Sequence, residues 1–178
     1  MRKPPLMPER RRNHLTRRFV AEMSQKAKSH AGLVSDNTGL PNRQAFDSGK
    51  ASPFAAMTDV RGMKVFNEQF SHAAGDMLIR RFAEVLTSVG LDAYHSLGAT
   101  ILCKGESYEE LNLKLSQAQQ ILRQQSFSVR ETNDRIHTIE GADFCFGIGT
   151  TLEEAEVALN HQKQLQTPEK AKRAGQKS

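Results

Sequence analysis

The sequence has no long hydrophobic run, and this absence excludes a membrane-spanning helix. No apolar stretch approaches the roughly 18 residues that a span requires. The chain starts with MRKPP and continues into a cluster of arginines, rather than into the apolar stretch of a signal peptide. We therefore expect a cytoplasmic protein with no membrane partner.

Cysteine is scarce as well, which argues against a cysteine-based metal or redox site. The two cysteines, Cys103 and Cys145, lie within apolar segments of the sequence. In that setting a buried free thiol is more common than a reactive one. Their spacing matches no metal-binding or redox motif, so we expect both thiols to be free and buried.

Acidic residues are rare at the two ends of the chain. Residues 1–18 hold seven Lys and Arg against one acid, and residues 163–178 hold five against one. Since the whole chain carries +5, these ends carry +10 and the residues between them −5. Basic arms of this kind can contact nucleic-acid phosphates without sequence preference, although they are more often solvated tails. No aromatic side chains are interleaved with them, so base recognition is not expected.

The length and composition allow one globular domain with short extensions, because the chain has 178 residues of which 38% are hydrophobic. Residues 1–13 contain three prolines and clustered charge, which predicts a mobile basic arm. Apolar residues at three- and four-residue steps predict an amphipathic N-terminal helix over 14–32. The domain itself is expected over 33–167, followed by a basic tail over 168–178.

The order of the predicted elements indicates the fold class. Apolar runs and turn residues predict strands over 53–60, 91–96, 99–104, 127–132, 135–139 and 142–149. Helical spacing predicts helices over 63–70, 74–89, 107–125 and 152–165, the last of which packs Ala155, Leu159 and Leu165. Strands that alternate with helices, and then occur three in a row, indicate an α+β fold with one mostly antiparallel sheet flanked by helices.

Three segments carry the motifs of a known family in their order and spacing. They are Thr38-Gly39-Leu40-Pro41-Asn42-Arg43 with Phe46, Asp59 with Lys64 and Asn67, and His72-Ala73-Ala74-Gly75-Asp76. Together they resemble the GGDEF (diguanylate cyclase) family over roughly residues 35–167. The resemblance implies a palm-like, ferredoxin-related fold.

The motif that names the family is absent, so the chain resembles a degenerate member. Where the family commonly reads A-Y-R-x-G-G-D-E-F, residues 93–101 read A-Y-H-S-L-G-A-T-I, which puts Ala99 and Thr100 at the two carboxylate positions. Ser35 replaces the leading Asp of the first motif. The R-x-x-D sequence of the family's inhibitory product site is also missing, since residues 88–92 contain no arginine.

The resemblance implies a reaction that these substitutions should prevent. Joining two GTP molecules requires two divalent cations that are held by carboxylates. Asp59 matches one metal ligand of the family, but Ala99 and Thr100 cannot supply the others, and Arg61 places a cation nearby. We therefore expect a vestigial metal position at Asp59, no catalytic residues, and Mg²⁺ binding that is weak or absent.

The nucleotide-recognition positions of the family are better kept. Asn67 and Asp76 match residues that bind the guanine edge. Lys64 matches a lysine beside the triphosphate, and Lys163 matches the lysine of the family's A-D-x-A-L-Y-x-A-K tail. Each residue also has an ordinary structural interpretation. Asn67 can be a solvated or locally bonded helix residue, Asp76 part of a helix start, and the two lysines solvated, while Asp59 can be a capping or turn residue.

These observations lead to one preferred function and two alternatives. The preferred hypothesis is a catalytically inactive GGDEF-like domain that acts as a regulatory or binding module, with a protein partner or self-association. Such a module requires no cofactor, and GTP is its possible ligand. The alternatives are an active diguanylate cyclase that makes cyclic di-GMP, and a nucleic-acid-associated protein that uses its basic arms.

Overall fold

The computed structural model describes residues 32–130 and 134–165 of the chain. Met1–Val34 and Ser35–Ser178 form separate units, and the fold below is that of the second unit. The predicted arm over 1–13, nearly all of the predicted helix over 14–32 and the tail over 168–178 lie outside the described residues. The helices that are described include none long and apolar enough to cross a membrane.

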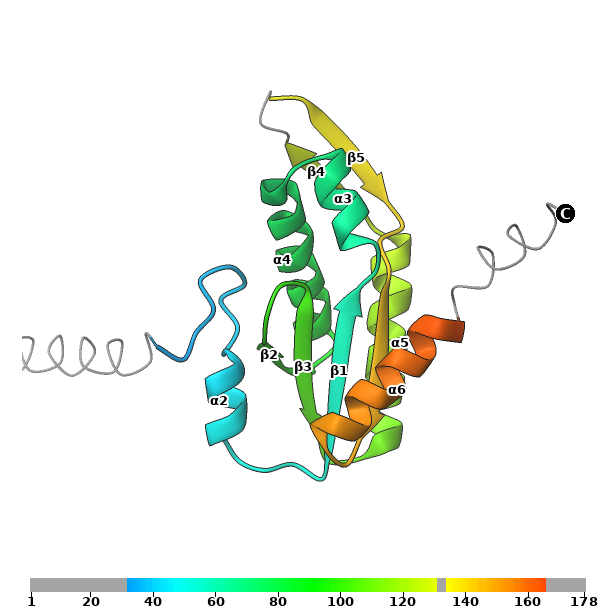
Figure 1. The fold of residues 1–178 in the computed structure, drawn as a ribbon. Helices are drawn as coiled ribbons and strands as arrows, with labels where there is room; N and C mark the ends of the chain where they lie inside the picture. Colours follow the sequence, from blue (N-terminus) through cyan, green and yellow to red (C-terminus); the bar gives the residue numbers. More distant parts are fainter. Residues whose placement is uncertain (1–31, 131–133, 166–178) are drawn as a thin grey trace, which may run out of the picture. The chain divides into compact units, whose positions relative to one another are not determined.

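A four-stranded antiparallel sheet forms the centre of the domain (Figure 1). Its order is β2 (Asp92–His95), β3 (Thr100–Gly105), β1 (Phe54–Val60) and β6 (Phe144–Gly149). β1 pairs with β3 on one side and with β6 on the other, so it lies in the interior of the sheet. These strands match the ranges predicted from apolar runs to within two residues at their ends.

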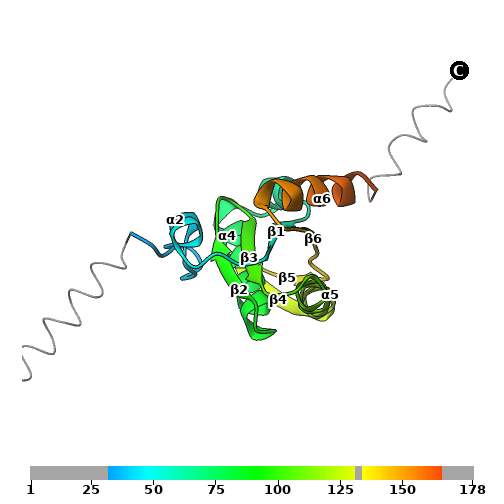
Figure 2. The ribbon, with the colours of Figure 1, turned by 90° about the horizontal axis from the view of Figure 1, so that it is seen from below.

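Helices cover both faces of the sheet, as Figures 1 and 2 show. α4 (His72–Ser88) and α5 (Tyr108–Gln124) pack on one face, where they form the main core with the inward residues of the strands. The largest fully buried side chains of this core are Phe82, Phe144, Leu78, Leu86, Ile101, Leu111, Leu115 and Leu122. Serine hydroxyls start both helices, since Ser71 accepts from the Ala74 amide and Ser107 from the Glu110 amide.

The opposite face carries α6 (Leu152–Leu165), which lies very close to β6. Glycine permits this approach, because a Cβ at Gly147 would overlap the backbone of Ala155 and Leu159. Ala155 and Leu159 are buried, as predicted, but Leu165 is 65% exposed, so the prediction that it joins the packed face is wrong. By Leu165 the helix has run past the edge of its contact with the sheet.

The short helix α2 (Arg43–Ser48) packs on the same face, at β2 and β3. Asn42 starts it by accepting a hydrogen bond from the Ala45 amide at 3.1 Å. Lys104 holds its other end, because its ammonium donates to the Phe46 carbonyl at 2.7 Å and lies 4.6 Å from the Phe46 ring centroid. The G-L-P-N-R turn is therefore a structural device that begins this helix.

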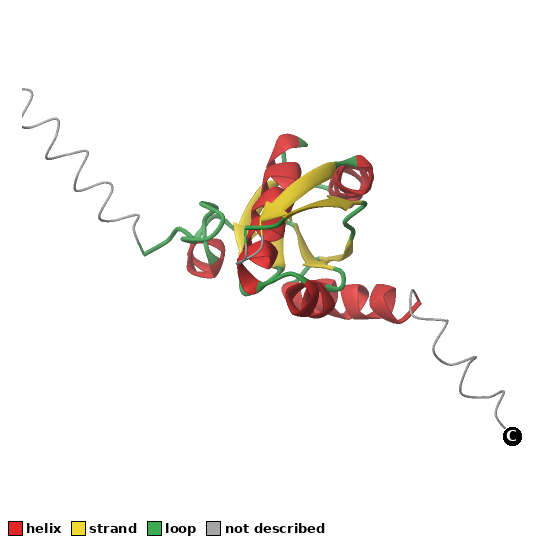
Figure 3. Cartoon of the chain, turned by 90° about the horizontal axis from the view of Figure 1, so that it is seen from above, coloured by secondary structure: helices red, strands yellow, loops and turns green. Residues whose placement is uncertain are grey.

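The late strands depart from the prediction of a single sheet. β4 (Ser126–Arg130) and β5 (Ile136–Glu140) pair only with each other and form a separate two-stranded hairpin (Figure 3). The hairpin lies at the end of the domain that carries α3 (Met63–Gln69), where the Phe70 and His137 rings are 5.2 Å apart. The turn residues between these two strands predict that they pair with each other, but local spacing does not indicate that the pair stays apart from the main sheet.

Candidate functional site

The candidate site lies where β1 ends, and the register of the sheet fixes the neighbours of Asp59 there. Asp59 is opposite Thr100 of β3 and Cys145 of β6. Successive side chains of a strand point to opposite faces, so Asp59 faces away from the core side, where its neighbour Val60 is buried. The side chain that faces the same way beside Asp59 on β3 is therefore a hydroxyl, not a second carboxylate.

Lys163 reaches Asp59 from the last turn of α6. Its ammonium Nζ lies 2.6 Å from Asp59 Oδ2, and the two side chains are 41% and 28% exposed, respectively. The alternative interpretation of Lys163 as a simply solvated lysine is wrong, because it is the counter-ion of Asp59. Asp59 is likewise an ion-pair partner rather than a cap.

The donor set around Asp59 does not fit a pair of divalent cations. Mg²⁺ needs several oxygen ligands, with carboxylates among them. In the ranges that the structure describes, no three His, Cys, Asp or Glu side chains are grouped so that they could hold a metal ion. The one carboxylate at the expected position is already neutralised by the Lys163 ammonium.

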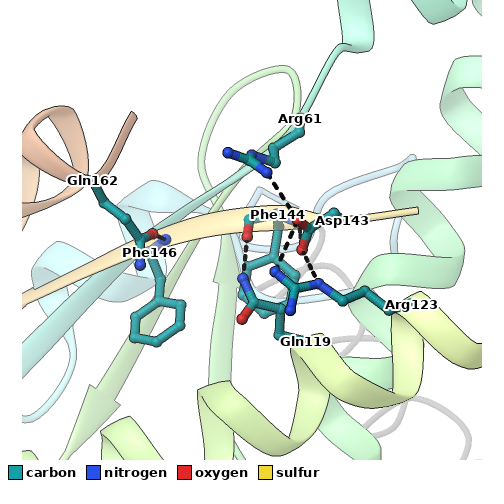
Figure 4. A network of polar contacts seen from close by, with 7 residues as sticks. All are labelled: Arg61, Gln119, Arg123, Asp143, Phe144, Phe146 and Gln162. Atoms are coloured by element: carbon teal, nitrogen blue, oxygen red, sulfur yellow. Dashed lines mark hydrogen bonds and ion pairs between the residues drawn. The ribbon is translucent and has the colours of Figure 1, made fainter. Parts of the chain in front are cut away.

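Arg61 belongs to a network of charges at the start of β6 (Figure 4). Its guanidinium donates to Asp143 Oδ2 at 3.1 Å, and Arg123 at the end of α5 binds both oxygens of the same carboxylate at 3.0 Å. The Phe144 amide also donates to Asp143, at 2.9 Å. Asp143 therefore joins β1, β6 and α5 just beyond the sheet, and it draws the Arg61 charge toward itself.

Two glutamines extend this polar layer along β6 (Figure 4). Gln119 of α5 donates to the Phe144 carbonyl, and the Phe146 amide donates to Gln162 of α6, both at 2.6 Å. Gln162 directly precedes Lys163, so its bond to the strand helps to fix the turn of α6 that carries the lysine. The sequence does not single out Asp143, Gln119 or Gln162, since nothing local marks a residue whose partners lie on other elements.

Asn67 of α3 packs against α4 at Gly75, the residue that precedes Asp76. Asn67 lies against Gly75, where a Cβ would overlap its amide oxygen. That oxygen is buried and has no hydrogen-bond partner among the described residues. The exposed Asp76 carboxylate, next to Gly75, receives a 3.5 Å hydrogen bond from Asn37. Ser71 caps α4, so Asp76 lies beyond its first turn and is not the feature that starts this helix.

Two further features near the end of β1 are Lys64 and the turn between β2 and β3. Lys64, on the first turn of α3, is exposed and makes no hydrogen bond or ion pair within the described ranges. His95 is 8% exposed and binds Ser35 through Nδ1 at 2.6 Å and the Gly98 carbonyl through Nε2 at 2.9 Å. It therefore ties the β2–β3 turn, which carries Ala99, to the segment that starts at Ser35.

Neither cysteine forms a disulfide bond within the residues that the structure describes. Cys103 and Cys145 are both buried, as predicted. Burial raises the pKa of Cys103 to about 12, and the charge of Asp92 acts in the same direction. A thiol with so high a pKa is protonated at neutral pH and is a poor nucleophile.

Comparison with known proteins gives matches among solved structures. No protein family model matches the chain, and no curated protein sequence does. The GGDEF domain of DgcB from Caulobacter crescentus, in complex with c-di-GMP, matches with a TM-score of 0.66 at 21% identity. The match covers 74% of this chain and 90% of that domain.

Two structures from Pseudomonas aeruginosa agree with this match. The diguanylate cyclase SiaD, in complex with its activator SiaC, has a TM-score of 0.64 at 21% identity and covers 88% of this chain and 72% of its own. The FimX GGDEF domain has a TM-score of 0.61 at 16% identity, with coverage of 75% and 94%. These likenesses confirm the predicted fold class. The chain therefore has the palm-like α+β fold of the GGDEF domains of diguanylate cyclases.

Proposed function

We propose that the chain is a catalytically inactive GGDEF-fold domain that acts as a regulatory or binding module and holds a guanine nucleotide. The observation that carries the proposal is the environment of Asp59. A hydroxyl stands beside it on β3 and an ammonium neutralises it from α6. A cyclase needs two divalent cations, which activate the ribose hydroxyl and neutralise the phosphates. The environment of Asp59 does not favour the binding of either cation.

The α3–α4 junction supports the choice of guanine. A buried amide oxygen without a hydrogen-bond partner lowers the stability of the fold by about 1–3 kcal/mol, unless a ligand donates a hydrogen bond to it. Asn67 is the candidate for this acceptor, and the carboxylate of Asp76, which follows Gly75 in α4, is the candidate for a second one. Guanine presents two adjacent donors on one edge, so a pair of acceptors suits it. The corresponding edge of adenine offers an acceptor next to its amino group.

Two lysines are candidates for binding the phosphates of a nucleotide. Lys64 is exposed on the first turn of α3, and Lys163 lies at Asp59. A protein partner is the second part of the proposal. SiaD is bound to its activator SiaC in the matching structure, so a domain of this fold can work in a complex with another protein.

Calorimetric titration of the purified chain with GTP, ATP and cyclic di-GMP tests the nucleotide proposal. We expect GTP to bind more tightly than ATP. Asn67→Ala and Asp76→Ala should each weaken GTP binding by about tenfold or more, because one hydrogen bond to the base is lost. Asn112→Ala, on the exposed side of α5, is the matched control and should leave the affinity unchanged.

The titration can fail in two distinct ways. Equal affinity for GTP and ATP, or unchanged affinity in both variants, would show that the lysines merely attract phosphate. No binding of any nucleotide would refute the guanine site and leave protein association as the function of the module. Circular dichroism spectra that match the parent would show that the variants are folded.

A further inference from the structure

Lys163 is placed at Asp59 by contacts that do not involve either charge. Gly147 and Gly149 allow α6 to lie against β6, where any Cβ would overlap the helix. Gln162, the preceding residue, accepts a hydrogen bond from the Phe146 amide. The helix is thus held in register with the sheet, and its last turn carries the ammonium to the carboxylate at the end of β1.

The ammonium of Lys163 neutralises the Asp59 carboxylate, as a bound divalent cation would otherwise do at this position. A compact ammonium 2.6 Å from Oδ2 also occupies the space in which a metal would bind that oxygen. A metal that approached Asp59 would have to displace Lys163 and would then meet its repulsion. The only ligand that Thr100 could give such a metal is a neutral hydroxyl oxygen.

We propose that Lys163 is a built-in counter-ion of Asp59 that keeps divalent metals away from this end of the sheet, so that phosphate-bearing ligands bind here without Mg²⁺. The inference rests on the proposed function for the nature of the ligand. The exclusion of metals by Lys163 is inferred separately, from its ion pair with Asp59 and from the packing of α6 on β6. The two claims are tested by separate readouts.

Paramagnetic broadening by Mn²⁺ alone, followed in amide NMR spectra of the full chain, tests the claim about the metal. In the parent chain we expect no broadening centred on Asp59, Thr100 and Cys145. Lys163→Met removes the charge but keeps an unbranched chain of similar length, and it should produce broadening at these three residues. Adding Asp59→Asn to this variant should abolish the broadening again, because the carboxylate is then gone.

Two control variants separate the role of the charge from other effects. Lys163→Arg keeps a cation at the position and should remain without local broadening. Lys114→Met removes a lysine that pairs with Glu110 on α5, so it breaks a comparable ion pair on another element. This variant should also show no broadening at Asp59.

The nucleotide part has its own readout, the GTP affinity measured with EDTA and with excess Mg²⁺. We expect equal or tighter binding in EDTA. Absence of GTP binding in both would refute the proposed function, while the Mn²⁺ spectra would still decide the role of Lys163. Broadening centred on Asp59 in the parent chain, or none after Lys163→Met, would overturn the counter-ion proposal.

Discussion

At the scale of single residues, a hydroxyl and an imidazole stand where the family pattern carries an acid and a base. Ser35 takes the place of the leading Asp, and His95 takes the place of the Arg before the missing motif. The two side chains contact each other at 2.6 Å. Because the Gly98 carbonyl can only accept, His95 donates to it from Nε2, while Nδ1 shares a hydrogen bond with the Ser35 hydroxyl. The two departures from the pattern therefore compensate each other.

Ser35→Ala tests this pair. The substitution leaves a nitrogen of the buried imidazole without a partner, which should cost about 1–3 kcal/mol of unfolding free energy. Ser48→Ala is the matched control, because its hydroxyl bonds an exposed helix carbonyl, and it should cost less than about 0.5 kcal/mol. Urea denaturation measures both. Equal losses in the two variants would show that the Ser35 hydroxyl contributes little to the domain.

At the scale of elements, α6 depends on the glycines of β6. In Gly147→Ala the new Cβ would meet the backbone of Ala155 and Leu159, which cannot swing away as a side chain can. We expect a loss of about 1–3 kcal/mol or more in stability, because overpacking moves the helix from the sheet. NMR shift changes should spread over α6 and reach Asp59.

Gly98→Ala serves as the comparator for this substitution. Gly98 has a φ of 58° and open space around its Cβ position, so only the left-handed backbone is penalised. The cost should be about 1–2 kcal/mol, with shift changes confined to the β2–β3 turn. Changes in α6 of the same size in both variants would contradict the packing account.

The start of α6 contains a pH-dependent contact. The pKa of Glu154 is lowered chiefly because its carboxylate accepts from the Thr150 hydroxyl, and also from the Thr150 amide. A carboxyl whose pKa is lower in the folded chain adds stability above its unfolded pKa, and this contribution is lost as the pH falls below about 4. Glu154→Gln should therefore lower the melting temperature at neutral pH and shrink that acid-side loss.

Melting curves of Glu154→Gln and of the control Glu153→Gln, recorded from neutral to acidic pH, provide the measurement. Glu153 is exposed on the same turn of α6. Its substitution should leave the pH profile close to that of the parent. A profile of Glu154→Gln that runs parallel to the parent at every pH would show that this carboxylate does not contribute.

At the scale of the whole molecule, the fold was more predictable than the site. Apolar spacing places β1 and α6 correctly because each element buries one face, a property that is local in sequence. The pairing of Lys163 with Asp59 depends on how α6 lies over the sheet. The Asp143 network likewise joins three elements. Such contacts follow from tertiary register, and sequence spacing does not carry that information.

The basic ends of the chain give a prediction that the domain alone does not. If residues 1–18 and 163–178 bind nucleic acid, the contacts should be to phosphates. The affinity should then fall steeply with added salt and be nearly equal for unrelated sequences. Mobility-shift assays on the full chain and on a variant without residues 1–13 measure this. A shift that persists in high salt, or that ignores the truncation, would place the binding surface on the folded body.

The environment of Asp59 predicts that the domain does not make cyclic di-GMP. The most direct measurement is product formation from GTP with Mg²⁺ or Mn²⁺, with a diguanylate cyclase as the positive control. We predict no product above the level without protein, because Asp59 is paired with Lys163 and faces a hydroxyl instead of a second carboxylate. Product above that level that disappears in Asp59→Ala would contradict the account.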